Sequence, residues 1–187
     1  MVEHMFGYAN IVAAPAGRLL VHLGRRYRED AFVREIARSV GLGVGPVSEA
    51  LRLLAAGHHL ERTERGRSVY YRANLGSGLV RAVKLAATLA ELDELLRDLA
   101  PHVHAVTLFG SCATGEDTVE SDIDLCIVTE EPGPVDAALA RHPVAGGRPV
   151  SAIVLGPDEF LALGQRDPAL AERIRQGRIA WEANRAL

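Results

Sequence analysis

The spacing of apolar residues along residues 1–77 predicts three helices followed by a β-hairpin. Asp30 suits the N-cap of the second helix, and Pro46 suits the first turn of the third. An arginine-rich turn then separates two short strand-like runs within residues 60–72. The helices are expected at residues 17–27, 30–40 and 46–57.

Residues 78–100 read as one long helix that Pro101 ends. Its leucines alternate spacings of four and three, which is typical of a coiled-coil seam. This helix either packs against its own chain or pairs with a second copy to form a homodimer, and the pattern leaves both interpretations open. The leucines of this stripe are Leu85, Leu89, Leu92, Leu96 and Leu99.

Strand-like and helical patterns alternate after Pro101, which predicts a small α/β module. We therefore expect an α+β chain with an N-terminal domain at 1–77, a connecting helix at 78–100 and a second domain at 101–187. The strands are expected at 103–109, 122–129 and 149–155, and the helices at 134–142, 158–163 and 168–176.

The composition is that of an ordinary globular protein, with 48% hydrophobic and 24% charged residues among 187. No apolar run approaches the roughly 20 residues of a membrane span, and no leader is evident. Cys112 and Cys126 lack the spacing of a metal motif, so two free thiols in the cytoplasm are the expectation.

Charge is unevenly distributed between the two parts of the chain. Residues 1–77 carry 11 Arg against 7 Asp and Glu, a net charge of +4, and the remaining residues carry −7, which sum to −3. A basic first part suggests a polyanionic partner, although a solvated basic surface would look the same.

Two carboxylates interrupt the apolar strand predicted at 122–129. Asp122 and Asp124 are two residues apart, so they share one face of that strand. Gly110 and Ser111 follow the preceding strand, where backbone N–H groups and a hydroxyl could bind a phosphate. A divalent cation with a phosphate is the chemistry of nucleotide transfer.

The two halves of this motif read FGSCATG over residues 109–115 and SDIDL over residues 121–125. Together they resemble the Gly-Ser…Asp-x-Asp signature of the polymerase-beta-like nucleotidyltransferases, and most closely the minimal nucleotidyltransferases. This resemblance implies that Asp122 and Asp124 are catalytic and ligate Mg²⁺ or Mn²⁺. It also implies that Gly110, Ser111 and Gly115 bind a nucleoside triphosphate.

The third acidic residue of that family is missing. Ser151 lies where it is expected on the next strand, and a hydroxyl is a poor ligand and a poor base. Glu159 lies beyond the strand, while Glu116, Asp117 and Glu120 are expected in a solvated loop. The motif therefore predicts nucleotide binding more firmly than turnover.

Residues 32–74 resemble bacterial winged helix-turn-helix regulators, through the run VSEALRLLAAG at 47–57 and the run GRSVYYRAN at 66–74. In that family the third helix enters the major groove of double-stranded DNA and the hairpin follows the phosphates. The resemblance implies groove contacts by Ser48, Glu49 and Arg52, and backbone contacts by Arg62, Arg65 and Arg67. A winged helix used only for protein contacts is the alternative.

Three functions fit these patterns. The first is a DNA-binding enzyme that transfers a nucleotide monophosphate to an acceptor, such as a toxin partner, since similar minimal nucleotidyltransferases act as antitoxins. The second is a transcriptional regulator whose degenerate catalytic domain senses nucleotide. The third is a module that only binds a protein partner.

Overall fold

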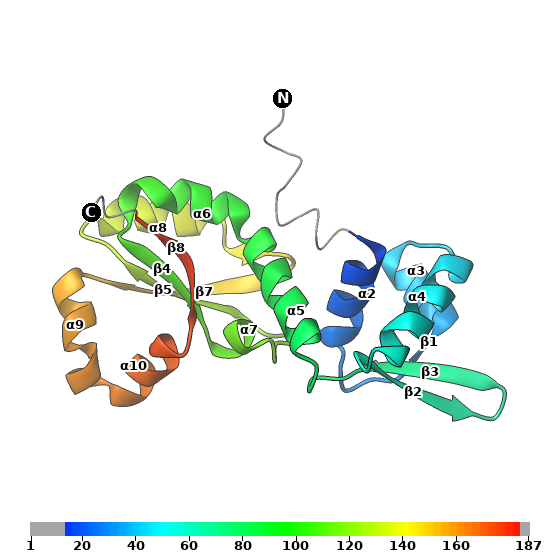
Figure 1. Ribbon diagram of the computed structural model, residues 1–187. Helices are drawn as coiled ribbons and strands as arrows, with labels where there is room; N and C mark the ends of the chain where they lie inside the picture. Colours follow the sequence, from blue (N-terminus) through cyan, green and yellow to red (C-terminus); the bar gives the residue numbers. More distant parts are fainter. Residues whose placement is uncertain (1–13, 184–187) are drawn as a thin grey trace. The chain divides into compact units, whose positions relative to one another are not determined.

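The computed structural model describes residues 14–183, which divide into two compact units (Figure 1). The N-terminal unit contains the described residues up to Ala90 together with Gly115–Val119. The C-terminal unit contains Glu91–Thr114 and the described residues from Glu120 onward. The division thus falls inside the helix predicted at 78–100. Within residues 14–183, no helix combines the length and the apolar character that crossing a membrane requires.

Three helices and a three-stranded antiparallel sheet make up most of the N-terminal unit. The helices are α2 (Pro15–Gly24), α3 (Val33–Val40) and α4 (Val44–Ala56), and the strands are β1 (Ala31–Phe32), β2 (Leu60–Arg65) and β3 (Ser68–Ala73). The strand order is β1-β3-β2, so the predicted hairpin is confirmed and gains a short third strand.

The second helix begins differently from the prediction. Phe32 occupies the N-cap position of α3, and its N–H donates to the Glu35 carboxylate at 3.2 Å. Asp30 precedes β1 and instead accepts a hydrogen bond from Arg65. A pairing partner distant in sequence has therefore replaced the local capping that the pattern predicted.

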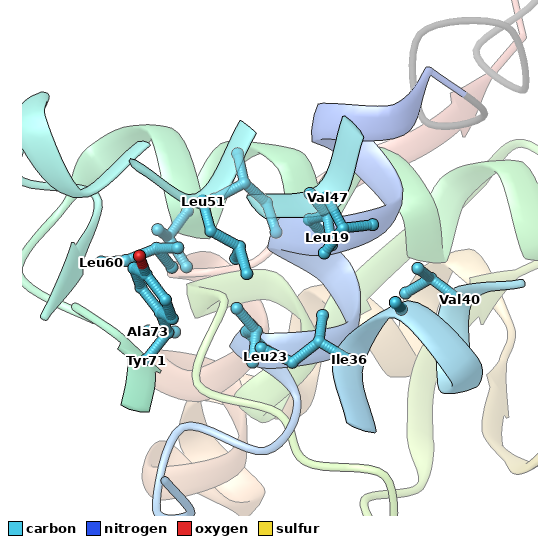
Figure 2. Close-up of a cluster of buried hydrophobic side chains, with 12 residues drawn as sticks. Leu19, Leu23, Ile36, Val40, Val47, Leu51, Leu60, Tyr71 and Ala73 are labelled. Carbon is cyan, nitrogen blue, oxygen red and sulfur yellow. The ribbon is translucent and has the colours of Figure 1, made fainter. Parts of the chain in front are cut away.

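The core of this unit forms where the helices meet the sheet (Figure 2). On each helix, apolar residues at spacings of three and four share one face. Alternate residues of β3 pack against these faces. The labelled members of this core are Leu19, Leu23, Ile36, Val40, Val47, Leu51, Leu60, Tyr71 and Ala73.

The leucine stripe does not lie on one continuous helix. The chain forms α5 (Gly78–Glu91) and α6 (Asp93–Leu99), interrupted at Leu92. In α5 the buried residues are Val80, Lys84, Ala87 and Thr88, while Leu85 and Leu89 are only partly buried. The buried face of α5 is therefore not the predicted seam, whereas Leu92 and Leu99 of that stripe are fully buried.

A five-stranded mixed sheet forms the centre of the C-terminal unit, in the order β6-β7-β5-β4-β8. Its strands are β4 (Ala105–Phe109), β5 (Ile123–Val128), β6 (Val144–Ala145), β7 (Arg148–Leu155) and β8 (Arg178–Glu182). The three predicted strands are confirmed as β4, β5 and β7, whereas the two edge strands were not predicted. β5 and β7 run parallel, and β4 is antiparallel to both β5 and β8.

Helices cover both faces of this sheet. α6 and α8 (Pro132–Arg141) lie over one face, and α9 (Pro157–Arg166) and α10 (Pro168–Arg175) lie over the other (Figure 1). Leu163 of α9 and Ile174 of α10 pack with Phe109 and Cys126 of the sheet. Asp124 is two residues from Cys126, so its side chain is on the face that α9 and α10 cover.

Candidate functional site

The site is centred on the turn that follows β4. Gly110 begins the short helix α7 (Gly110–Thr114) with φ at +68°, a conformation that glycine adopts readily. A Cβ placed on Gly110 would overlap the Asp124 carboxylate and lie 3.4 Å from its Cγ. A glycine at this position therefore lets the backbone approach the acidic pair, and Ser111 occupies the first turn beside it.

Cys112 joins this turn to the acidic strand. Its thiol donates to the Asp122 carbonyl oxygen at 3.3 Å, and Arg148 Nη1 lies 3.2 Å from Cys112 Sγ. Arg148 is only 2% exposed and forms an ion pair with Glu91 at 2.9 Å. These contacts hold the backbone of Asp122 against α7. They also give Arg148 a structural role, and its guanidinium is not available to bind a ligand.

Asp122 and Asp124 lie where β5 begins. Asp122 is exposed directly before the strand, and Asp124 is partly buried within it. Burial raises the pKa of the Asp124 carboxyl above its usual value, the nearby charge of Arg173 opposes this effect, and the charge of Asp122 adds to it. Two like charges near each other in a partly desolvated position favour a bound cation.

The strand register shows which residue lies beside Asp124 on the next strand. Ser151 is the direct partner of Asp124 in the parallel pairing of β5 and β7. Glu159 does not replace an acid there, because its carboxylate accepts the Gly156 N–H at 2.9 Å as α9 begins. Across residues 14–183, no group of three or more His, Cys, Asp or Glu side chains could hold a metal ion.

Arg173 is a candidate site residue that the sequence pattern did not reveal. Its guanidinium lies 5.3 Å from the centre of the Phe109 ring, and Phe109 pairs with Asp124 across the sheet. Arg173 also lowers the pKa of Asp124 against the larger effect of burial. An exposed guanidinium beside the acidic pair suits the binding of phosphate oxygens. The basic last turn of the predicted helix at 168–176 was the only available signal.

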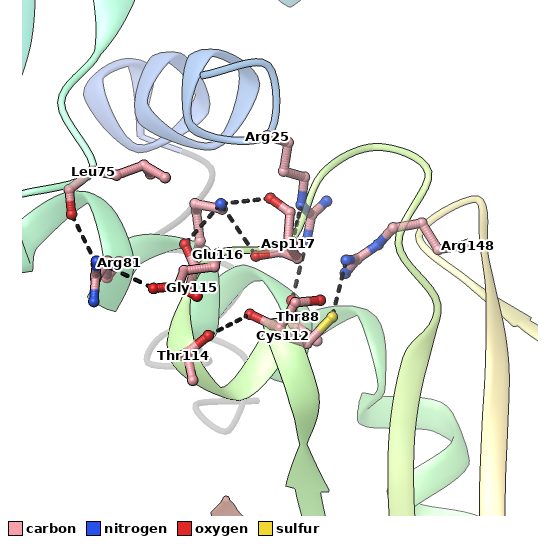
Figure 3. Close-up of polar contacts among 12 residues, drawn as sticks. Arg25, Leu75, Arg81, Thr88, Cys112, Thr114, Gly115, Glu116, Asp117 and Arg148 are labelled. Carbon is pink, nitrogen blue, oxygen red and sulfur yellow. Dashed lines mark hydrogen bonds and ion pairs between the residues drawn. The ribbon is translucent and has the colours of Figure 1, made fainter. Parts of the chain in front are cut away.

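The loop between the two halves of the motif exposes Glu116 and Glu120 as predicted, but the prediction was wrong for Asp117. Asp117 is 0% exposed and forms ion pairs with Arg25 at 3.2 Å and with Lys84 at 3.3 Å (Figure 3). Glu116 is exposed and pairs with Arg81 at 3.3 Å. The sequence analysis assigned no role to Lys84 or Arg25.

Gly115 lies in the same segment, within the N-terminal unit. Its φ is +72°, and an added Cβ would lie 2.8 Å from the Arg81 Cα. The absence of a side chain is thus required by close packing on α5. Its predicted place beside a nucleotide remains a prediction.

The residues implied in DNA binding lie on two exposed surfaces of the N-terminal unit. Ser48, Glu49 and Arg52 are exposed on α4, and Arg52 forms an ion pair with Glu49 at 2.6 Å. Leu53, on the same helix, is also 57% exposed.

The arginines of the hairpin form a second exposed surface. Arg62 and Arg65 lie on β2, and Arg67 lies in the turn that follows. Arg62 pairs with Glu64 at 2.7 Å, and Arg65 pairs with Asp30. Acidic neighbours therefore offset part of the positive charge that the arginine count suggested.

A comparison with protein-family models matches residues 89–175 to the family described as nucleotidyltransferase domain. The comparison with curated proteins found no match. The matched range contains Gly110, Ser111, both aspartates of the motif and Arg173. This part of the chain is therefore similar to nucleotidyltransferase domains, which supports nucleotidyl transfer as the chemistry of the site.

Proposed function

We propose that the C-terminal unit binds a nucleoside triphosphate together with Mg²⁺ or Mn²⁺ and transfers a nucleotide monophosphate to an acceptor. The close approach of Gly110 to the Asp124 carboxylate is the observation that carries this proposal. The Gly110–Ser111 turn, which we propose binds phosphate, thus lies against one carboxylate of the acidic pair, within a region similar to nucleotidyltransferase domains.

The donor set fits a hard divalent cation. Asp122 and Asp124 offer carboxylate oxygens, which Mg²⁺ and Mn²⁺ prefer. Burial raises the pKa of Asp124 because it disfavours the charged carboxylate, and a bound cation would stabilise that charge. A cation bound there would neutralise charge on the triphosphate as pyrophosphate leaves. Phosphate oxygens and water would complete its coordination shell.

The remaining groups suit the phosphates. The Ser111 hydroxyl and the amides of the α7 turn can donate to phosphate oxygens, and Arg173 can add a charged, two-pronged donor. In the transfer step an acceptor oxygen bonds to the α-phosphorus as the bond to pyrophosphate breaks. Ser151 cannot take the acceptor proton as a carboxylate would.

Ser151 favours a second candidate function, that of a nucleotide sensor without turnover. Its place in register with Asp124 leaves the site one carboxylate short of the family pattern. A sensor needs only to bind nucleotide and change the behaviour of the rest of the chain. The two candidates differ in whether a nucleotide is ever transferred.

Incubation with α-³²P-labelled ATP, GTP, CTP and UTP tests the transfer. The reaction contains Mg²⁺ or Mn²⁺ and candidate acceptors, including proteins. Transfer of label that is lost in an Asp122→Ala/Asp124→Ala variant would establish the enzyme. Nucleotide binding by calorimetry without transfer would favour the sensor, and Ser151→Asp should then increase metal affinity. If wild-type protein binds no triphosphate with either metal, both candidates are wrong.

We infer that the N-terminal unit is a winged helix-turn-helix that binds double-stranded DNA. The order of three helices and a hairpin, the exposed α4 face and the hairpin arginines support this inference. In such domains the α4 equivalent reads the major groove and the hairpin follows the backbone. Glu49 and Asp30 hold Arg52 and Arg65 in ion pairs, which DNA phosphates would have to replace.

Binding to labelled duplex DNA over a range of salt concentrations tests this inference. Affinity should fall steeply with salt, and an Arg65→Ala/Arg67→Ala variant should bind every sequence more weakly. Salt-insensitive binding, or no binding, would favour a protein-contact role. A toxin-like acceptor and a homodimer remain predictions that co-purification and light scattering can examine.

A further inference from the structure

Lys84 is a fully buried lysine whose charged end contacts one short segment of the chain. Its Nζ donates to the carbonyl oxygens of Gly115 at 2.8 Å and of Asp117 at 2.6 Å. The third contact is the ion pair with the Asp117 carboxylate at 3.3 Å. Two of the three N–H donors of the ammonium group thus bond to main-chain oxygens of this segment.

Arg25 completes the cluster from α2. It lies 3.2 Å from the Asp117 carboxylate and donates to Thr88 Oγ1 at 3.2 Å (Figure 3). Buried ion pairs contribute little to stability, because desolvation opposes the attraction between the charges. A sequence that needed only stability at this place could have used apolar side chains. The arrangement fixes the main chain of Gly115 and Asp117 instead, which apolar side chains could not do.

The segment is also held by close packing. The left-handed backbone of Gly115 brings the chain against the main chain of Arg81 on α5, where a Cβ would not fit. The hydrogen bonds from Lys84 and this packing therefore hold the segment Gly115–Val119 at Gly115 and Asp117.

These five residues are the middle of the loop that joins the two halves of the nucleotide motif. Only three residues separate Ser111 from Gly115, and only two separate Val119 from Asp122. With so few free residues on each side, the path of the segment restricts where the turn and the acidic pair can lie.

We propose that Lys84 and Asp117 are positioning residues for the nucleotide site, acting through the segment Gly115–Val119. The part of this inference that concerns nucleotide affinity rests on the proposed function. The part that concerns the order of the loop does not depend on it.

The test removes the anchor while keeping the interior apolar. In an Arg25→Met/Lys84→Met/Asp117→Leu variant of the full chain, no buried charge is left without a partner, so the fold should persist. Glu116→Gln is the matched control, because it breaks an exposed ion pair on the same segment. Fluorescence of Trp181, the only tryptophan, reports whether the C-terminal unit remains folded.

Hydrogen exchange is the first readout, measured on amides of residues 110–114 and 120–124 with β7 as the reference. We expect at least tenfold faster exchange at both motif halves in the triple variant and no change in β7. The second readout is the affinity for Mg²⁺ with ATP by calorimetry, which should fall at least tenfold while Trp181 unfolding is unchanged. Glu116→Gln should match the wild type in both.

A folded triple variant with unchanged exchange at the motif halves would overturn the inference. If the wild type binds no nucleotide, the proposed function fails, and exchange alone decides the inference. Should the triple variant not fold, Lys84→Gln takes its place, since its amide can keep only part of the anchoring. Unchanged exchange in that variant would equally reject a positioning role.

Discussion

Replacing Gly110 with alanine should damage the nucleotide site through two separable effects. The first is backbone strain, because a φ of +68° costs an alanine about 1–2 kcal/mol. The second is steric, because the new methyl group would overlap the Asp124 carboxylate. Forcing an extra methyl into such a place typically costs about 1–3 kcal/mol. The free energy of unfolding should therefore fall by about 2–5 kcal/mol.

Gly147 provides a matched control in the same unit. Its φ is +78°, and an added Cβ would meet no atom within 4 Å. Gly147→Ala should therefore show only the backbone cost of about 1–2 kcal/mol. Urea unfolding followed through Trp181 fluorescence measures both variants in the C-terminal unit, since the four tyrosines all lie in the N-terminal part of the chain.

A double-mutant cycle isolates the steric effect. Combining Gly110→Ala with Asp124→Ala removes the overlapping carboxylate, so the penalty at Gly110 should shrink to that of Gly147→Ala. Mg²⁺-ATP affinity should fall at least tenfold in Gly110→Ala and stay unchanged in Gly147→Ala. Equal unfolding free energies for the two single variants, or no coupling in the cycle, would refute the close approach of the turn to Asp124.

Three further variants address charge. With metal removed by a chelator, Asp124→Asn should be more stable than wild type at neutral pH. Because the folded-state pKa of Asp124 is raised, wild-type stability falls as pH rises through that pKa, so the gain should vanish in acid, as urea titrations would show. Arg173→Gln should weaken triphosphate binding measured by calorimetry, whereas Arg175→Gln, on the same helix, should not. Arg67→Ala should reduce the slope of log affinity for DNA against log salt concentration by the amount expected for about one phosphate contact. An unchanged slope would show that Arg67 does not contact the DNA backbone.

Much of the candidate site was predictable because its signals are local. Gly110 and Ser111 directly follow one strand, and Asp122 and Asp124 are two residues apart where the next strand begins, so spacing along the chain sufficed. The absence of a third acid was inferred from the family resemblance, and the structure pairs Ser151 with Asp124 across two strands. The helices and the hairpin of the N-terminal part were predictable in the same way, from the periodic spacing of apolar residues along the chain.

Other features depended on contacts between residues far apart in the chain. Arg173 approaches Asp124 only because α10 packs on that face of the sheet. The edge strand β8 has no alternating pattern strong enough to predict it, and it exists because β4 pairs with it.

The sequence by itself determined the kinds of element, the Gly-Ser turn after β4 and the acidic pair at the start of β5, because each is set by residues within about a dozen positions of one another. Only the tertiary structure decided that Lys84 of α5 would be buried and that a buried Asp117 would form an ion pair with it. The periodicity of apolar residues does not predict such an ion pair, because a buried charge is tolerated only where another part of the chain supplies a partner of opposite charge.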